Sequence, residues 1–200
     1  MLRWVGGVSM LVFGQWAGTA LAQSAASNFT TGYRYDAARR VTGVISPDPD
    51  GTGGNAFAAV RNTYDGAGRL TMVEKGALAT WQAETVAPSA WSGFTVYSIV
   101  ETVYDGMGRK ARERNRGRTL VDSAFVTTSM TQYNYRSDGQ VNCIAERMNP
   151  SIFGSLFSGS LVVDACALAT EGTGSDAYGK DRITKHFYDD AGQLTQIRKA

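Results

Sequence analysis

Few side chains in this sequence of 200 residues have both the chemistry and the spacing of a catalytic or metal-binding site. His186 is the only histidine, so an H-E-x-x-H zinc site, which needs two, is excluded. A Ser-His-Asp triad would have to use His186, but the chain contains no G-x-S-x-G nucleophile motif. Asp189 and Asp190 are adjacent, and adjacent residues of a strand point to opposite faces instead of converging as an acid–base pair. We therefore expect no enzymatic activity, no metal site and no cofactor.

The two cysteines, Cys143 and Cys166, are separated by 22 residues. This spacing lacks the C-x-x-C step of common zinc sites, so a disulfide formed in an oxidising compartment is the favoured interpretation. An unstrained bridge would stabilise the fold by ~3 kcal/mol, because it closes the intervening loop in the unfolded chain. Two separate buried thiols remain the alternative, since spacing alone does not bring the two Cβ atoms together.

Residues 1–22 have the layout of a secretory signal peptide, with an early cation at Arg3, an apolar middle, and small residues at Ala20 and Ala22. Polar and glycine residues interrupt the apolar run, which falls short of the ~20 residues of a membrane span; a retained anchor is the alternative. Loss of Arg3 changes the formal net charge from +2 to +1, and a near-neutral chain has no charge pattern for nucleic acid. We expect residues 23–200 to be secreted, periplasmic or cell-envelope associated, with no stable membrane span after cleavage.

The elements that carry these residues are defined by a motif that recurs five times. The copies are YRYDAARRV (33–41), NTYDGAGRL (62–70), TVYDGMGRK (102–110), YNYRSDGQV (133–141) and HFYDDAGQL (186–194). Their anchor tyrosines are 29, 40, 31 and 53 residues apart. A constant motif at irregular spacing indicates one structural unit that carries connections of different length.

Each copy predicts a β-hairpin. β-Forming residues precede the turn, and apolar and polar residues alternate after it, as in RLTMVEK (69–75). The Asp can accept hydrogen bonds from backbone N–H groups two residues on, and the Gly supplies the positive φ that a tight turn requires. Arg69 or Arg109 can pair with Asp65 or Asp105, or lie across a Tyr ring as a cation–π contact. A charge that recurs at every turn indicates a structural role.

The candidate site residues are therefore those of the turns, and we expect them to act structurally. They are Tyr35, Asp36, Tyr64, Asp65, Gly68, Arg69, Tyr104, Asp105, Gly108, Arg109, Tyr135, Gly139, Tyr188, Asp189 and Gly192. His186 occupies the position of Tyr33 and Tyr133 in other copies, so we expect it to pack across strands.

These residues resemble the YD repeats of the RHS (rearrangement hotspot) family, whose pattern is approximately YxYDxxGRL. The copies at Tyr64 and Tyr104 carry the full core. The other copies depart from it, with Arg39 in place of Gly, Arg136 in place of Asp, and Gln140 and Gln193 in place of Arg. The departure at Arg39 bears most on turn geometry, because a side chain at positive φ is sterically costly.

The resemblance implies a β-hairpin ribbon that spirals into a hollow shell, with roles in enclosing toxin domains or in recognition at a cell surface. Five hairpins are few for closing such a shell, and the family's C-terminal core region is not recognisable in this sequence. An uncovered sheet edge pairs readily with another strand. We therefore expect the partners to be further YD repeats or a partner protein at the open edge.

The two long spacings mark insertions. The first, residues 76–94, holds Trp81 and Trp91, which are expected to cover an open end of the sheet or, alternatively, to form a platform for a cell-surface glycan. The second, residues 143–182, contains both cysteines and predicts a stapled excursion with a helical turn near residues 161–169.

The sequence thus predicts an all-β domain of consecutive β-hairpins that form a spiralling ribbon or partial shell, with two loop insertions. The expected function is that of a non-enzymatic, exported scaffold, part of an RHS-type shell that encloses or presents a partner or toxin domain. A carbohydrate-binding or cell-surface-binding module of the same fold is the alternative.

Overall fold

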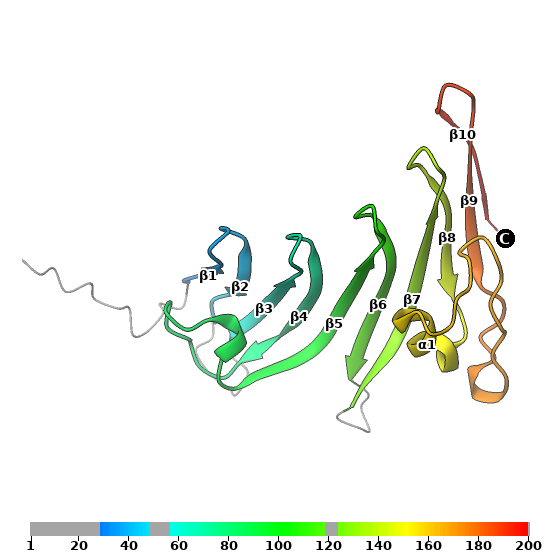
Figure 1. Ribbon diagram of the computed structural model, residues 1–200. Helices are drawn as coiled ribbons and strands as arrows, with labels where there is room; N and C mark the ends of the chain where they lie inside the picture. Colours follow the sequence, from blue (N-terminus) through cyan, green and yellow to red (C-terminus); the bar gives the residue numbers. More distant parts are fainter. Residues whose placement is uncertain (1–28, 49–56, 119–123, 200) are drawn as a thin grey trace, which may run out of the picture.

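The computed structural model describes residues 29–48, 57–118 and 124–199, which form one ten-stranded antiparallel sheet in the order β1 to β10 (Figure 1). The predicted signal peptide, residues 1–22, lies outside the described residues. The strands are β1 (Gly32–Tyr35), β2 (Val41–Ile45), β3 (Phe57–Tyr64), β4 (Leu70–Leu78), β5 (Phe94–Tyr104), β6 (Lys110–Arg118), β7 (Phe125–Tyr135), β8 (Val141–Arg147), β9 (Arg182–Tyr188) and β10 (Leu194–Lys199). Short helices are η1 (Pro88–Ala90), η2 (Pro150–Ile152), α1 (Phe153–Ser158) and η3 (Gly174–Asp176).

Every strand pairs with its neighbour in the sequence, so the sheet is a run of hairpins. A copy of the motif forms the turn of each of the pairs β1–β2, β3–β4, β5–β6, β7–β8 and β9–β10. A register shift lies next to the turn in all five, as between Thr63 and Tyr64. The predicted fold of consecutive hairpins is therefore confirmed, and among the described residues the sheet is open, with β1 and β10 as its edges.

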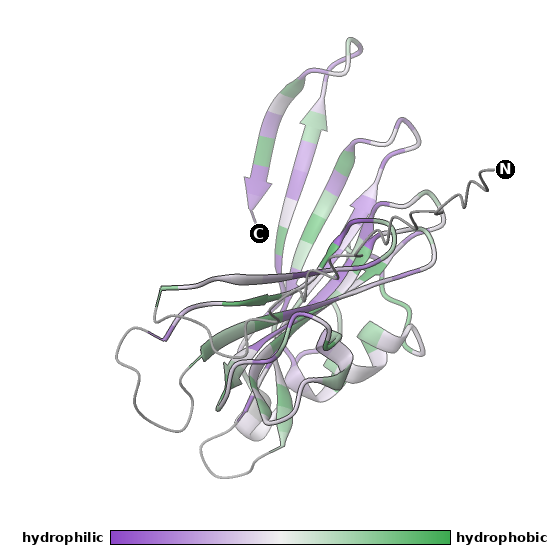
Figure 2. Ribbon diagram, turned by 90° about the vertical axis from the view of Figure 1, so that its left-hand side faces the viewer, coloured by the Kyte–Doolittle hydropathy of each residue, from purple (hydrophilic) through white to green (hydrophobic). Residues whose placement is uncertain are grey.

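Both insertions pack on the same face of the sheet, which we call the insertion face. Pro88 and Trp91 lie against Gly43, and the Arg61 side chain on the same cross-strand row donates to the carbonyl of Pro88. Further along this face, Arg114 lies over Phe157 of the second insertion. Hydrophobic and hydrophilic bands alternate along the strands (Figure 2), as expected for a sheet that buries one face locally.

The core is divided into small clusters beneath the insertions. One comprises Ile45, Ala59, Leu78 and Trp91, a second Met130, Phe153 and Leu156, and a third Cys143, Ala145 and Ala165. Each cluster combines residues of the sheet with residues of an insertion. The insertions therefore supply the apolar cover that a single open sheet lacks.

The helix of the second insertion is α1, so the prediction of a helical turn at residues 161–169 is wrong. The chain enters at Asn149, whose side chain accepts from the N–H of Ser151, and Pro150 occupies the first turn of η2. Gly159, at a φ of 83°, ends α1 in the left-handed conformation. The predicted segment includes Val162 and Val163, whose β-branched side chains disfavour a helix.

Candidate functional site: the repeated turns and the hairpin junctions

The five repeated turns share one backbone geometry. In the second copy, the N–H of Asp65 donates to the carbonyl of Arg69 at 2.9 Å, and the N–H of Gly68 donates to the carbonyl of Asp65 at 2.9 Å. The same two bonds occur in the other four copies. Gly68, Gly108, Gly139 and Gly192 have φ values of 81°, 81°, 89° and 78°. The predicted positive φ at the motif glycine is thus confirmed.

The motif aspartate holds the turn from inside. One carboxylate oxygen of Asp65 accepts from the N–H groups of Ala67 and Arg69, each at 2.9 Å. The other accepts from the Arg69 guanidinium at 2.7 Å, and Asp105 and Arg109 repeat this arrangement. The backbone hydrogen bond from Arg69 and the contact with its guanidinium lower the pKa of Asp65.

The motif arginine also joins one hairpin to the next. The guanidinium carbon of Arg69 lies 4.7 Å from the ring centroid of Tyr104, and that of Arg109 lies 4.2 Å from the ring of Tyr135. Arg40 stands in the same way over Tyr64, at 4.6 Å. The sequence predicted an ion pair or a cation–π contact; the structure has both, and the ring belongs to the following copy.

The anchor tyrosine completes this junction from the other side. The hydroxyl of Tyr104 donates to the carbonyl of Leu70 at 2.8 Å, and those of Tyr64, Tyr135 and Tyr188 donate in the same way to the preceding hairpin. We call the Arg-over-Tyr contact together with this hydrogen bond the Arg–Tyr junction. It occurs four times and links all five hairpins at their turn end.

The departures from the motif are accommodated without losing the turn. Arg39 takes a φ of 62°, as the only non-glycine residue at positive φ among the described ones. In the fourth copy Arg136, in the place of Asp, lies 5.3 Å from the ring centroid of Tyr188, and Asp138 accepts from the N–H of Gln140. Gln140 donates to the carbonyl of Gly192 at 2.6 Å. The fourth junction therefore persists with its cation moved to another position of the turn.

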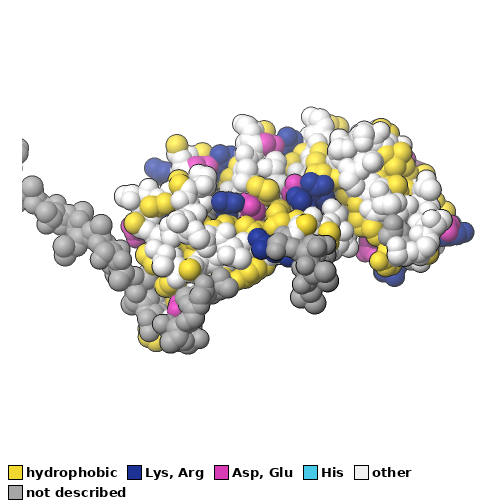
Figure 3. All heavy atoms as spheres, turned by 90° about the horizontal axis from the view of Figure 1, so that it is seen from below, with side chains coloured by type: hydrophobic (Ala, Val, Ile, Leu, Met, Phe, Trp, Pro, Cys, Tyr) yellow, Lys and Arg dark blue, Asp and Glu magenta, His cyan; other side chains and the backbone are white. Residues whose placement is uncertain are grey.

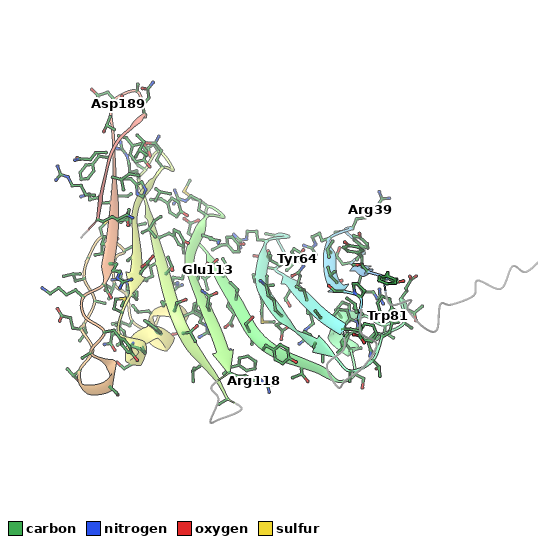
Figure 4. All side chains as sticks on the ribbon, turned by 180° about the vertical axis from the view of Figure 1, so that it is seen from behind. Arg39, Tyr64, Trp81, Glu113, Arg118 and Asp189 are labelled. Carbon is green, nitrogen blue, oxygen red and sulfur yellow. A yellow bond between two sulfur atoms is a disulfide. The ribbon has the colours of Figure 1, made fainter. Side chains whose placement is uncertain are left out.

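The first and last copies have no such junction on their outer sides in the part of the chain that the structure describes. Tyr35 is 60% exposed and stacks on Tyr33, with ring centroids 6.4 Å apart. At the other end Gln193 stands where the motif has Arg. Arg39 and Asp189 mark these two outer turns in Figure 4.

The tryptophans of the first insertion are used for packing. Trp91 is 7% exposed and meets Phe94 edge to face at 5.7 Å between ring centroids. Trp81 lies against Gly32 and edge to face with Phe57, at 5.8 Å. Their contacts match the covering role that the sequence favoured, and the ring of Trp91 has no exposed face for a sugar.

A disulfide and a buried ion pair attach the second insertion to the sheet. Cys143 and Cys166 form a disulfide with a Cα–Cα distance of 5.3 Å, which confirms the favoured interpretation over separate thiols. Close by, the Arg147 side chain donates to Asp181 at 2.6 Å, to Gln132 at 2.6 Å, and to two insertion carbonyls. The side chains of Arg147 and Asp181 are 0% and 4% exposed. No pattern in the sequence predicts this buried pair, whose members are 34 residues apart.

The insertion face also carries ion pairs that sequence reasoning missed. Arg61 pairs with Glu74, with contacts of 2.6 and 2.8 Å, and Arg114 pairs with Glu101, with contacts of 2.7 and 3.0 Å. Burial raises the pKa of Glu101, but the hydrogen bond and charge of Arg114 outweigh it, so the pKa is lowered. Seen from below, charged side chains of both signs lie among hydrophobic ones (Figure 3). Cross-strand register would have identified the two ion pairs once the hairpins were aligned.

The residues considered for chemistry at the outset do not converge. His186 lies in β9, opposite Ile197 of β10. Among the described residues, no group of three or more His, Cys, Asp or Glu side chains could hold a metal ion. None of the helices within the described ranges is long and apolar enough to cross a membrane.

Comparison with known proteins gives little. No family model and no curated protein matches the chain. Among solved structures, a mutant Tc holotoxin pore of Photorhabdus luminescens is similar over 86% of this chain and 9% of that chain, at 15% identity and a TM-score of 0.23. The chain thus spans less than a tenth of that protein, and a TM-score this low supports no argument about fold or function.

Proposed function

We propose that this chain is a non-enzymatic, exported scaffold made of YD-type repeats, and that it forms part of a shell that encloses or presents a partner. The observation that carries the proposal is the Arg–Tyr junction. Four of the five turns place a cation over the anchor ring of the next hairpin. The charged side chains of the motif therefore make contacts that hold neighbouring hairpins together, as a structural role requires.

The two outer strands support a role in assembly. β1 and β10 each pair with one strand among the described residues, and strand edges add further strands readily. Tyr35 presents an exposed ring where the inner copies of this residue receive an arginine. Further YD repeats, or an edge strand of a partner protein, are the partners that match this surface.

Export is supported by two features of different kind. Residues 1–22 have the composition of a signal peptide. The disulfide between Cys143 and Cys166 belongs to an oxidising compartment. We infer that the chain works outside the cytoplasm, in the periplasm, at the cell envelope or in the medium.

The proposal is tested by measuring the native mass of the protein isolated from its own cells, followed by cross-linking mass spectrometry. We expect an assembly heavier than the chain, with cross-links that connect β1 or β10 to a partner. A solitary monomer with hydrolytic activity that His186→Ala abolishes would overturn the scaffold proposal. His186→Phe serves as a control that keeps a ring in β9.

A further inference from the structure

One inner strand has an edge that no other strand covers within the described ranges. β7 runs from Phe125 to Tyr135, but its pairing with β8 begins only at Met130, opposite Arg147. We call residues Phe125–Ser129 the open half of β7; of the strands that the structure describes, only β6 pairs with them. In Figure 1, β7 extends past the end of β8. Among the described residues, no backbone hydrogen bond joins the open half to anything except β6. The N–H and C=O groups of the open half that do not pair with β6 therefore face the uncovered side, and a register shift, where Asn115 pairs with Ser129 and Arg116 with Thr127, interrupts their alternation.

A cavity lies along this edge. It has a volume of about 660 Å³ and is bounded on one side by β7 from Val126 onward, on the other by Pro150, Phe153 and Tyr178. Met130 and Phe153 are apolar residues of its lining, and they are only 1% and 3% exposed because they pack in one buried cluster. Its mouth is accessible, since Val126 and Tyr178 are 43% and 59% exposed.

Hydrogen bonds and the disulfide fix the second insertion, which forms the far wall of this cavity, at a distance from the open half of β7. The backbone N–H of Met148 donates to Asp181 at 2.9 Å, and Asp181 also accepts from Arg147. Asn149 donates to the carbonyl of Thr170 at 3.0 Å, and the disulfide lies at the base of the insertion. These contacts keep an uncovered strand edge and an apolar wall side by side.

We propose that the open half of β7 binds an extended peptide segment of a partner protein by strand addition. Five residues of strand span about 16 Å, and an added strand satisfies the backbone groups that face the cavity. The segment would direct apolar side chains at Val126 and Tyr178, the accessible apolar residues of the cavity. A backbone ligand fits better than a sugar or a small ring compound, because the unpaired polar groups of this edge are the backbone N–H and C=O groups of a strand.

This proposal deepens the scaffold function and rests on it, since it names the chemistry of a presented or enclosed partner. It uses an inner edge between two hairpins, whereas assembly through further repeats would use β1 or β10. The two ideas therefore make predictions about different strands.

The first experiment is a selection of random twelve-residue peptides by display against the full chain, followed by amide hydrogen exchange. In the free protein we expect fast exchange at those amides of Phe125–Ser129 that do not pair with β6, and slow exchange at Met130–Tyr135. A selected peptide should slow the fast amides of the open half and leave β1 and β10 unchanged. Peptides that protect other strands, or a selection that yields no binder, would overturn the proposal.

The second experiment distinguishes backbone pairing from nonspecific hydrophobic binding of the peptide. N-methylation of alternate peptide residues should abolish binding in one register and leave it intact in the other, because only one set of amides faces β7. Tyr178→Ala should raise the Kd by about tenfold or more, whereas Tyr33→Ala, a similarly exposed tyrosine at the far end of the sheet, should not. Equal effects of both N-methylated sets would exclude strand addition.

The same exchange measurement also tests whether a second copy of this chain occupies the open half of β7. Protection of the open half that rises with protein concentration in the absence of peptide would show that another copy occupies the edge, and would overturn the proposal of a partner segment. If the native assembly of the scaffold is found but no peptide binds, only this further inference fails. If peptide binds to a chain that is a solitary monomer in its cells, the assembly part of the proposed function fails.

Discussion

At the turn end of the sheet the same Arg–Tyr junction joins neighbouring hairpins four times. At the opposite end of the strands, which we call the insertion end, the ion pair between Arg147 and Asp181 occurs once. The turn-end contacts lie in partly exposed positions, with side chains such as Arg69 and Asp65 at 35% and 22% exposure. The insertion-end tie between Arg147 and Asp181 is buried. The same sheet is thus stabilised in two ways: by partly exposed contacts that recur at each hairpin, and by a buried ion pair that occurs once.

The largest expected effect is at the insertion end. Arg147→Ala removes the partner of a buried carboxylate, and breaking a buried pair on one side typically costs about 3–5 kcal/mol. We expect a loss of this size in the free energy of unfolding, measured by urea titration. Arg182→Ala is the control, because its side chain is 72% exposed and lies 3.9 Å from Glu146. Equal losses in both variants would mean that the buried network does not hold the insertion.

The disulfide should contribute somewhat less. Replacing it with Cys143→Ala and Cys166→Ser together removes a cross-link between residues 23 positions apart, for which we expect a loss of about 3 kcal/mol. Amide hydrogen exchange should rise mainly in the second insertion. A reducing agent should destabilise the natural chain by the same amount and leave the double variant unchanged; a further effect on the variant would contradict the assignment.

At the turn end a single position should matter about half as much. Gly108 has a φ of 81°, so Gly108→Ala should destabilise by about 1–2 kcal/mol through steric strain. Gly106 lies in the same turn without a positive φ, and no atom lies within 4 Å of a Cβ built there. Gly106→Ala should therefore be neutral or slightly stabilising. Comparing the thermal unfolding of the two variants separates the effect of the positive φ at Gly108 from the effect of replacing any glycine of the turn.

The Arg–Tyr junction can be tested by removing one oxygen atom. Tyr104→Phe deletes the hydroxyl that donates to Leu70, and we expect a loss of about 0.5–1.5 kcal/mol. Tyr35 is the matched control, because its copy has no preceding hairpin among the described residues. Tyr35→Phe should change the free energy of unfolding very little. A comparable loss in this variant would mean that the effect of the hydroxyl does not come from the Arg–Tyr junction.

The two ends also differ in what the sequence could predict. The turn is local, so Asp65, Gly68 and Arg69 within five positions were enough to predict its hydrogen bonds and its positive φ. The partner of Arg69 is Tyr104, which lies beyond the whole first insertion, and no pattern in the sequence specifies that distance. The Arg147 network likewise depends on where the second insertion folds back, which spacing does not determine. Cys143 and Cys166 were the exception, because a cysteine pair has only one possible intramolecular partner.

The smallest effect concerns acid, and it should be confined to the turn end. The backbone hydrogen bonds from Arg40 and Arg69, with their guanidinium groups, lower the pKa values of Asp36 and Asp65; at Asp105 burial acts in the opposite direction but is outweighed. A folded-state pKa below the unfolded value of about 3.9 means that the stabilisation is complete above that pH and is lost as the pH falls through the folded value. The urea midpoint of the natural chain should therefore decline below about pH 4. Replacing Asp36, Asp65 and Asp105 with Asn should lower the midpoint at pH 7 and flatten this decline, because the amides do not titrate. An equally steep decline in the triple variant would assign the acid sensitivity to carboxylates such as Glu101 on the insertion face instead of to the turns.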